Sequence, residues 1–279
     1  MSKINRNPIR LIASDLDRTL LSDEGEIKEY TQAVIARLLQ EGVLIVPGTS
    51  RAYGDLPGSL LETAIRYYVC SNGAIVWDRQ KGSIYSRHAM SASTAIRILE
   101  ATQAISKAVT IVSEGKIYSE KAIVAIFESQ GMHPQIMKRL GKKRTLVDDI
   151  TTVLPQFEFI DKLHLNFPDT YSKQECLKLL PPLPQCNLTS SHPGNIEITD
   201  IEADKGKAVK QLADLYGIKQ NGIMSFGDSE NDLRLFDVAG VKVAMINGEE
   251  KVKQAADRVT ELNNEQEGVA HFISDFLGY

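Results

Sequence analysis

Short apolar runs alternate with helix-like segments at both ends of this chain, and this order constrains the fold more than any other feature. Residues 9–13 form an apolar run, and residues 27–39 then carry apolar side chains at helical spacing up to Gly42. Further apolar runs lie at 43–46 and 67–70. Strands that alternate with helices form βαβ units with parallel strands. The sequence therefore predicts an α/β fold with a Rossmann-like parallel sheet.

The same alternation returns in the last third of the chain, with helical periodicity over 205–216 and an apolar run at 223–226. The segment between differs, because its strand-like pieces and helices do not alternate regularly, which is typical of an α+β module. A length of 279 residues is also more than one average domain requires. We therefore expect a core domain built from residues 1–82 and 191–279, and an inserted α+β cap domain over 83–190.

Charge and cysteine content exclude several classes of function. The formal net charge of -4 provides no basic field for nucleic acid or for an anionic membrane surface. The three cysteines, Cys70, Cys176 and Cys186, have neither the spacing of a zinc site nor the even number of a disulfide framework. No apolar run reaches the roughly 18 residues of a membrane span. We expect a cytoplasmic protein that acts on a small molecule, and the sequence does not indicate its oligomeric state.

Two carboxylates follow the first predicted strand. Asp15 and Asp17 come directly after the run at 9–13, at the strand end where open α/β sheets bind ligands. Repulsion between two close carboxylates raises one pKa, so the pair can supply an ionised nucleophile and a proton carrier. A magnesium ion beside them would neutralise the charge of the site and of a phosphate. In the alternative interpretation, Asp17 and Thr19 are turn or capping residues.

Two further segments could hold a phosphate. Thr49 and Ser50 follow the second predicted strand, where a hydroxyl and backbone N–H groups can bind phosphate oxygens. Lys205 begins the helix predicted over 205–216, where the helix dipole and the ammonium group both favour an anion. Taken alone, a Ser/Thr cap and a solvated lysine are the more common explanations of these residues.

A third acidic segment follows the strand predicted at 223–226. It contains Asp228, Glu230, Asn231 and Asp232 within five residues. Carboxylate oxygens are the ligands that magnesium prefers, and one or two carboxylates with waters suffice. The segment therefore predicts a magnesium site, with Glu230 pointing to solvent. An acidic helix start, capped by Asp228 or Ser229, is the alternative.

Taken in order, these motifs resemble the haloacid dehalogenase superfamily, and most of all its Cof-type phosphatases, which carry an inserted α/β cap. The matching segments are Asp15-x-Asp17-x-Thr19, Thr49-Ser50-Arg51, Lys205-Gly206, Gly227-Asp228-x-x-Asn231-Asp232 and Ser71-Asn72-Gly73-Ala74. The likeness covers essentially the whole predicted core, and the cap of such proteins selects the substrate.

The resemblance implies a role for each matching residue. Asp15 would be the nucleophile, and Asp17 would be the general acid and base. The substrate contacts would come from Thr49, Ser50, Lys205 and Asn231. The Mg²⁺ ligands would be Asp15, Asp17 through its main-chain carbonyl, Asp228 and Asp232.

Several residues depart from the family pattern. Arg18 stands where the family has a glycine before the threonine, and Ser50 stands where the family has the glycine of Thr-Gly-Arg. Near the end of the chain, the usual Gly-Asn-Ala reads Ile246-Asn247-Gly248. The Arg18 side chain could crowd the mouth of the site or contact an anionic substrate.

The resulting hypothesis is a magnesium-dependent phosphatase that hydrolyses small phosphomonoesters, such as sugar phosphates, through an aspartyl-phosphate on Asp15. A phosphosugar mutase would use the same intermediate but needs a second anion site. The candidate for that site is a basic cluster formed by Lys138, Arg139, Lys142, Lys143 and Arg144, although such a cluster is more often a solvated face. A non-catalytic protein that binds phosphometabolites is the third alternative, and the paired nucleophile and acid argue against it.

Overall fold

The chain folds into two units, each with its own hydrophobic core. The structure, a computed structural model, describes residues 9–131, 143–190 and 193–278. Unit 1 comprises Met1–Ser50, Leu56–Tyr85 and Asp204–Tyr279, and unit 2 comprises Arg51–Asp55 and Ser86–Ala203. Among the described residues, no helix has the length and apolar character to cross a membrane.

Unit 1 is built around a parallel sheet with the strand order β16-β15-β14-β1-β2. The strands are β1 (Leu11–Ser14), β2 (Leu44–Pro47), β14 (Ile223–Gly227), β15 (Val241–Ala244) and β16 (Arg258–Val259). Because β1 pairs with both β14 and β2, the two ends of the chain meet in the middle of the sheet. The predicted α/β class with a parallel sheet is confirmed.

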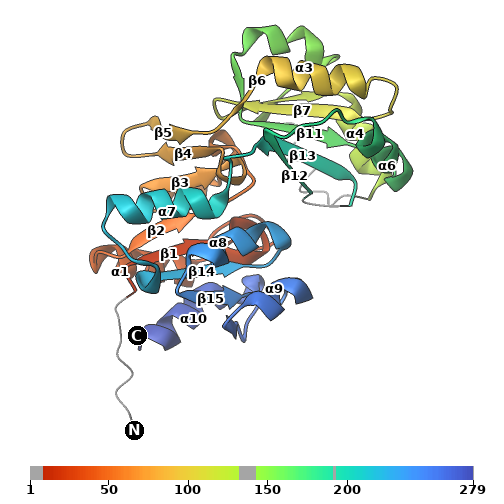
Figure 1. The fold of residues 1–279 in the computed structure, drawn as a ribbon. Helices are drawn as coiled ribbons and strands as arrows, with labels where there is room; N and C mark the ends of the chain where they lie inside the picture. Colours follow the sequence, from red (N-terminus) through yellow and green to blue (C-terminus); the bar gives the residue numbers. More distant parts are fainter. Residues whose placement is uncertain (1–8, 132–142, 191–192, 279) are drawn as a thin grey trace. The chain divides into compact units, whose positions relative to one another are not determined.

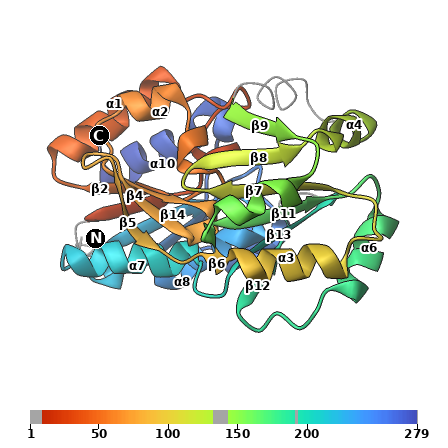
Figure 2. The same ribbon diagram turned by 90° about the horizontal axis from the view of Figure 1, so that it is seen from above.

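Helices cover both faces of this sheet. In Figures 1 and 2, α1 (Glu29–Gln40) and α10 (Gly268–Leu277) lie on one face, and α7 (Lys205–Leu215) and α8 (Leu233–Val238) lie on the other. Successive side chains of a strand point to opposite faces. Leu11 of β1 accordingly packs in one cluster with Val209 and Leu212 of α7. The short helices α2 (Gly58–Glu62) and α9 (Glu250–Ala255) complete the unit.

A second sheet of three strands also belongs largely to unit 1. Its strands are β3 (Tyr67–Cys70), β4 (Ile75–Asp78) and β5 (Ser83–Arg87), in the order β3-β4-β5. A parallel bridge between Gly48 and Val69 connects β3 to the segment that follows β2. The sequence predicted β3 with these bounds, whereas it did not predict β4.

Unit 2 contains a six-stranded sheet with the order β12-β13-β11-β7-β8-β9. Its strands are β7 (Ala108–Ser113), β8 (Lys116–Glu120), β9 (Arg144–Val147), β11 (Lys162–Asn166), β12 (Cys186–Thr189) and β13 (Asn195–Asp200). The helices are α3 (Ala92–Ala101), α4 (Ala122–Ser129) and α6 (Thr170–Leu179). A short strand pair, β6 (Met90–Ser91) with β10 (Phe159–Ile160), completes the unit. This mixture of helices and mainly antiparallel strands is the α+β module that the sequence predicted.

Strand β13 is the last strand of the six-stranded sheet along the chain. It pairs with β11 and β12, and the chain enters the last part of unit 1 at Asp204. The sequence instead placed the end of the inserted domain near residue 190, at a Pro-rich segment. The assignment of 1–82 with 191–279 to a catalytic core and of 83–190 to a cap stays a prediction.

Candidate active site

The carboxyl ends of β1, β2 and β14 meet at one edge of the parallel sheet. Asp15 directly follows β1, and its backbone N–H donates to the Phe226 carbonyl of β14 (3.1 Å). Gly48 directly follows β2, and its N–H donates to the Ser14 carbonyl (2.8 Å). Because the strands are parallel, the segments that follow them share this edge. Motifs far apart in the sequence are therefore adjacent in space.

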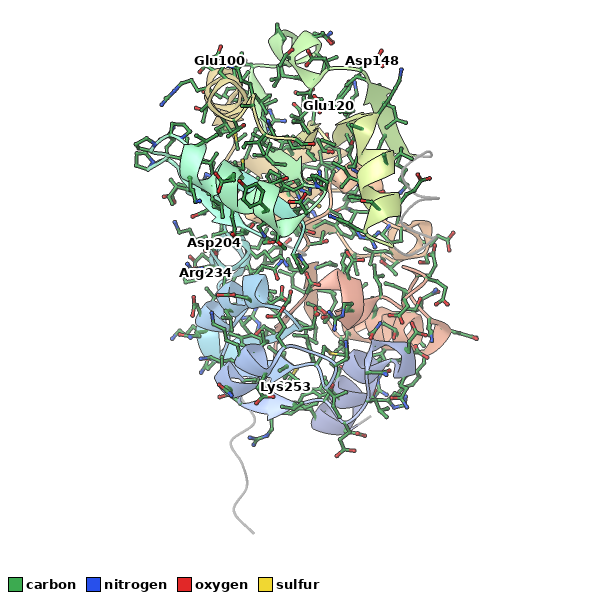
Figure 3. The ribbon with its side chains drawn as sticks, turned by 90° about the vertical axis from the view of Figure 1, so that its right-hand side faces the viewer. Glu100, Glu120, Asp148, Asp204, Arg234 and Lys253 are labelled. Carbon is green, nitrogen blue, oxygen red and sulfur yellow. The ribbon has the colours of Figure 1, made fainter. Side chains whose placement is uncertain are left out.

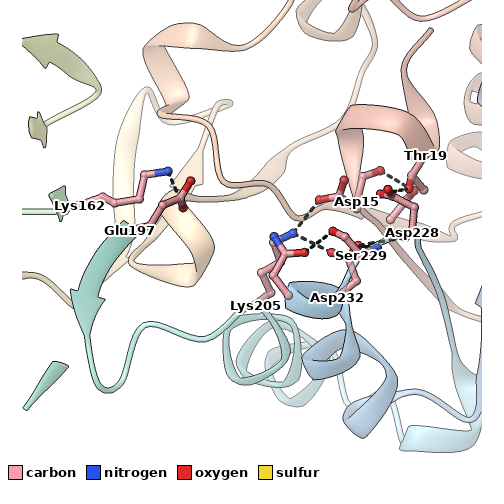
Figure 4. A network of polar contacts seen from close by, with 10 residues as sticks. Asp15, Thr19, Lys162, Glu197, Lys205, Asp228, Ser229 and Asp232 are labelled. Carbon is pink, nitrogen blue, oxygen red and sulfur yellow. Dashed lines mark hydrogen bonds and ion pairs between the residues drawn. The ribbon is translucent and has the colours of Figure 1, made fainter. Parts of the chain in front are cut away.

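Lys205 joins two acidic side chains at this edge. Its Nζ lies 2.6 Å from Asp15 Oδ1 and 2.8 Å from Asp232 Oδ1 (Figure 4). Lys205 is only 2% exposed and Asp232 is 0% exposed, so water screens these charges weakly. Burial alone would lower the pKa of Lys205, but Asp15 and Asp232 outweigh burial and raise it. The ammonium group is therefore a fixed positive charge within the site.

The start of α7 sets the position of Lys205. Asp204 caps this helix, since its side chain accepts a hydrogen bond from the Lys207 N–H (2.9 Å). Gly206 allows α7 to lie close to α8, because a Cβ at Gly206 would be 2.0 Å from the Arg234 carbonyl oxygen. Arg234 Nε also lies 3.5 Å from Asp204 Oδ2, and Figure 3 shows the two side chains near each other. Contact between the two helices thus holds Lys205 beside Asp232.

Three buried carboxylates form a group that fits a divalent cation. Asp15, Asp228 and Asp232 each offer an oxygen, and these oxygens lie within 4.8 Å of one another. The backbone N–H of Asp228 donates to Asp232 Oδ2 (3.0 Å), and the Thr19 hydroxyl donates to Asp228 Oδ1 (3.1 Å). The positive charges of Lys205 and Arg18 do not balance three ionised carboxylates. A close group of carboxylate oxygens with excess negative charge is the donor set that Mg²⁺ prefers.

Burial and mutual repulsion disfavour the ionised acids. Burial, with the charges of Asp232 and Asp228, raises the pKa of Asp15 well above its usual value, although Lys205 opposes this. Burial, followed by repulsion from Asp232, raises the pKa of Asp228 to about 6, although Arg18 opposes this. A bound cation would favour the ionised forms and so offset the cost of burying them.

Asp17 and Thr49 lie at the same edge but outside the buried carboxylate group. Asp17 is exposed and has an extended backbone, so its side chain is accessible from solvent. Thr49 is buried, and its backbone N–H donates to the Val69 carbonyl of β3 (2.8 Å). A Cβ at Gly48 would be 3.8 Å from Lys205 Cδ, so the segment that carries Thr49 lies next to Lys205.

Ser50 and Asn231 are half-buried. Asn231 Oδ1 accepts a hydrogen bond from the Ser229 hydroxyl (2.7 Å), and Ser229 caps the turn over 230–232. The capping interpretation of this acidic segment is therefore correct for Ser229, and it does not conflict with a metal site. Glu230 is exposed, as predicted. The roles assigned to Ser50 and Asn231 stay predictions.

Sequence reasoning missed two contacts in this site. Thr19, interpreted as a possible cap, instead donates its hydroxyl hydrogen to Asp228. Arg18 Nη2 donates to the Asn247 carbonyl (2.9 Å), and Asn247 Nδ2 donates to the Arg18 carbonyl (2.8 Å). Arg18, which departs from the family pattern, therefore contacts Asn247, which keeps the asparagine of the usual Gly-Asn-Ala. The sequence did not indicate this contact, because the two residues are 229 positions apart.

The basic cluster considered for a second anion lies mostly outside the described residues, which do not include Lys138, Arg139 and Lys142. Within unit 2, Lys143 Nζ lies 3.9 Å from Asp55 Oδ1, and Arg144 donates to the Ser119 hydroxyl (3.3 Å). Both described members thus have partners in their own unit. No specific observation favours the mutase alternative.

Comparison with known proteins is consistent with this geometry. Residues 12–273 match the family described as haloacid dehalogenase-like hydrolases. YxeH of Bacillus subtilis is 30% identical over 96% of this chain and 98% of its own length. The Bacillus subtilis 5-amino-6-(5-phospho-D-ribitylamino)uracil phosphatase YwtE is 29% identical, with 96% of this chain and 98% of its own length covered. The solved structure of the subclass IIB sugar phosphatase BT4131 has the same fold, with a TM-score of 0.77, 20% identity and coverage of 96% of this chain and 98% of that chain.

Proposed function

Because this chain belongs to the haloacid dehalogenase-like hydrolases and is a phosphatase, we propose that it hydrolyses small phosphomonoesters with Mg²⁺ as its cofactor. In this proposal Asp15 is the nucleophile and forms an aspartyl-phosphate. The observation that carries the proposal is the buried contact of Asp15 with Lys205 (2.6 Å) within a group of three carboxylates. Burying each of these charges costs desolvation free energy, so we do not expect such a group at a sheet edge that serves only the structure.

The first step transfers the phosphoryl group to Asp15. A carboxylate oxygen of Asp15 attacks phosphorus, and the bond between phosphorus and the ester oxygen breaks. Asp17 donates a proton to the departing alkoxide, which leaves as an alcohol. Lys205 holds Asp15 Oδ1 in place and favours its ionised form. Asp17 is exposed and Asp15 is buried, so the two carboxyl groups have different environments. Lys205, and a bound cation, would offset the rise that burial causes in the pKa of Asp15.

The second step releases inorganic phosphate. Asp17, now ionised, accepts a proton from a water molecule as that water attacks the phosphorus of the aspartyl-phosphate. The bond between phosphorus and the Asp15 oxygen breaks, which restores the Asp15 carboxylate and the protonated Asp17. Thr49, Ser50, Lys205 and Asn231 are the proposed contacts of the phosphoryl oxygens and of the substrate.

Mg²⁺ would be held by the carboxylates of Asp15, Asp228 and Asp232 and by the main-chain carbonyl of Asp17. When bound, the ion would neutralise negative charge on the acids and on the phosphoryl group. The carboxylates of Asp228 and Asp232 also accept hydrogen bonds from the protein. The Thr19 hydroxyl donates to Asp228, and the backbone N–H of Asp228 donates to Asp232. These hydrogen bonds orient the carboxylates before a ligand arrives.

The substrate class proposed here is a phosphorylated sugar or sugar alcohol. Support comes from the relative YwtE, named for a substrate with a phosphoribityl group, and from the fold shared with a sugar phosphatase. A net charge of -4 also argues against nucleic acid and anionic membranes as partners, and a cytoplasmic location fits a substrate of this kind.

Phosphate release from p-nitrophenyl phosphate tests this proposal. We expect release that requires Mg²⁺, stops on addition of a chelator and is lost in Asp15→Asn, which cannot be phosphorylated. Asp214→Asn changes an exposed acid on α7 and should hydrolyse the ester like the unaltered protein. Release that persists in Asp15→Asn, or that needs no metal, would rule out the mechanism. Movement of phosphate within a hexose phosphate without net release would favour the mutase.

A further inference from the structure

Arg18 has a backbone conformation that residues other than glycine rarely adopt. Its φ is 62°, within the left-handed region, and the neighbouring Asp17 is extended. A side chain in this region crowds the following carbonyl and costs conformational free energy. Strained positions of this kind persist only where surrounding contacts fix them, and they cluster at functional sites. The chain therefore keeps an arginine where glycine would be less strained.

Contacts with Asn247 fix the position of the Arg18 guanidinium. Arg18 Nη2 donates to the Asn247 carbonyl (2.9 Å), and the Asn247 side chain donates to the Arg18 carbonyl (2.8 Å). Asn247 in turn belongs to a tight turn, since the Gly248 N–H donates to the Met245 carbonyl (2.9 Å). A guanidinium held in this way loses less side-chain entropy when it binds a ligand.

The guanidinium lies beside the carboxylate group but remains accessible. Arg18 Nε is 3.7 Å from Asp228 Oδ2, and the Arg18 side chain is 60% exposed. Lys205, which also lies at this edge, is 1% exposed and already contacts Asp15 and Asp232. Among the described residues, none accepts a hydrogen bond from Arg18 Nη1. Arg18 is thus an exposed cation beside the buried carboxylates that can meet an incoming ligand.

We propose that Arg18 binds a second anionic group of the substrate, either a carboxylate or a phosphate, beside the phosphoryl group that Asp15 receives. The planar guanidinium offers paired N–H donors that match both kinds of anion. This inference rests on the proposed function and narrows it to phosphomonoesters with a second negative charge. Arg18 would then be a specificity-determining residue of the site.

Matched substrates that differ by one anionic group test the proposal. 3-Phosphoglycerate carries a carboxylate that glycerol 3-phosphate lacks, and glucose 1,6-bisphosphate carries a phosphate that glucose 6-phosphate lacks. In the unaltered protein we expect a higher kcat/KM for the ester with two anionic groups than for its partner with one, in at least one pair. Arg18→Gln should reduce that ratio at least about tenfold, the effect of losing one charge-assisted hydrogen bond. The pair that responds identifies the second group as a carboxylate or a phosphate.

Arg10→Gln is the control, because Arg10 is also exposed and donates to backbone carbonyls, at Gly217 and Tyr216, but lies at the opposite end of β1. It should leave both ratios unchanged. Equal losses for both members of each pair in Arg18→Gln, or no preference in the unaltered protein, would overturn the proposal.

Calorimetric binding of the same four esters to Asp15→Asn, with and without Arg18→Gln, separates this inference from the proposed function. If the unaltered protein hydrolyses neither these esters nor p-nitrophenyl phosphate, the phosphatase mechanism fails. Tighter binding of a doubly anionic ester that depends on Arg18 would still support the role of Arg18. Binding that is independent of Arg18 would reject that role alone.

Discussion

Lys205 lies in contact with two of the three buried acids of this site. Its Nζ is within 2.8 Å of Asp15 and of Asp232, and all three side chains are shielded from water. Removal of one partner from a buried ion pair leaves an uncompensated charge, which is more damaging than the loss of the pair itself. We therefore expect the lysine to stabilise the folded site, in addition to its proposed contact with the phosphoryl group.

Replacement of this lysine should impair both stability and activity. In Lys205→Met, measured with a chelator present, we expect the free energy of unfolding to fall by about 3 kcal/mol because Asp15 and Asp232 lose their counter-ion. With Mg²⁺ present, kcat/KM should fall at least about 100-fold, because a charge beside the phosphoryl group is lost. Urea denaturation and p-nitrophenyl phosphate hydrolysis measure the two effects.

Lys210→Met provides the matched control on the same helix. Lys210 is half-exposed and pairs with Asp214 on the surface of α7. Its replacement should change the unfolding free energy by less than about 0.5 kcal/mol. If both variants lose the same stability and activity, the buried ion pairs do not explain the effect.

Among the connecting elements, the turn over 71–73 links two parts of the site. Ser71, Asn72 and Gly73 all have positive φ. The Asn72 N–H donates to the Thr49 carbonyl (3.0 Å), and a Cβ at Gly73 would lie 2.3 Å from the backbone of Asp204. The turn therefore packs against both the segment of Thr49 and the start of the helix that carries Lys205.

Gly73→Ala should lower the free energy of unfolding by more than the cost of placing alanine at a positive φ. The added Cβ must displace the Asp204 backbone, which overpacks the turn and shifts the helix start. We expect a loss of about 3 kcal/mol in unfolding free energy, together with lower kcat/KM. Gly82→Ala introduces a side chain at a φ of +64° with nothing within 4 Å, and it should cost only about 1 kcal/mol and leave activity intact. Equal losses in the two variants would show that contact with Asp204 does not matter.

For the molecule as a whole, we expect the acids at the sheet edge to couple folding to metal binding and to pH. Mg²⁺ that binds only the folded site stabilises it by about 2.7 kcal/mol when its concentration is 100 times the dissociation constant. Without metal, the pKa of Asp228 is raised from its usual 3.8 to about 6, so the folded protein retains a proton that the unfolded chain releases. This contribution to stability is present below pH 4 and is lost as pH rises through about 6.

The stabilisation by Mg²⁺ should therefore have the opposite pH dependence. Because the ion binds the ionised carboxylate, the rise in unfolding temperature on addition of Mg²⁺ should be small near pH 5 and should grow as pH increases through about 6. Thermal unfolding with and without a chelator, followed from pH 5 to about 8, measures this difference.

Asp228→Asn should reduce the Mg²⁺ effect at every pH, whereas Asp214→Asn, which changes a surface acid, should retain it. A metal effect that is independent of pH and of Asp228 would place the bound ion elsewhere.

The sequence by itself determined the alternation of strands and helices around the parallel sheet and which segments follow its strands. Periods of apolar residues are local, so the strand at 67–70 and the helix that starts at Lys205 could be predicted within a residue at each end. Asp15 and Asp228 could be assigned to one sheet edge because each follows an apolar run, and parallel strands bring such ends together. The match over residues 12–273 confirms the family that these motifs indicated.

The tertiary structure decided which residues are buried and which distant residues touch. Neither the burial of Asp15 beside an exposed Asp17 nor the contact of Arg18 with Asn247 can be read from spacing, since the latter residues are 229 positions apart. Strand β13 likewise belongs to the six-stranded sheet because it pairs with β11, and its own residues do not indicate this pairing. These features arise from long-range packing, whose free energy depends on all the groups that meet and is not encoded in any single segment.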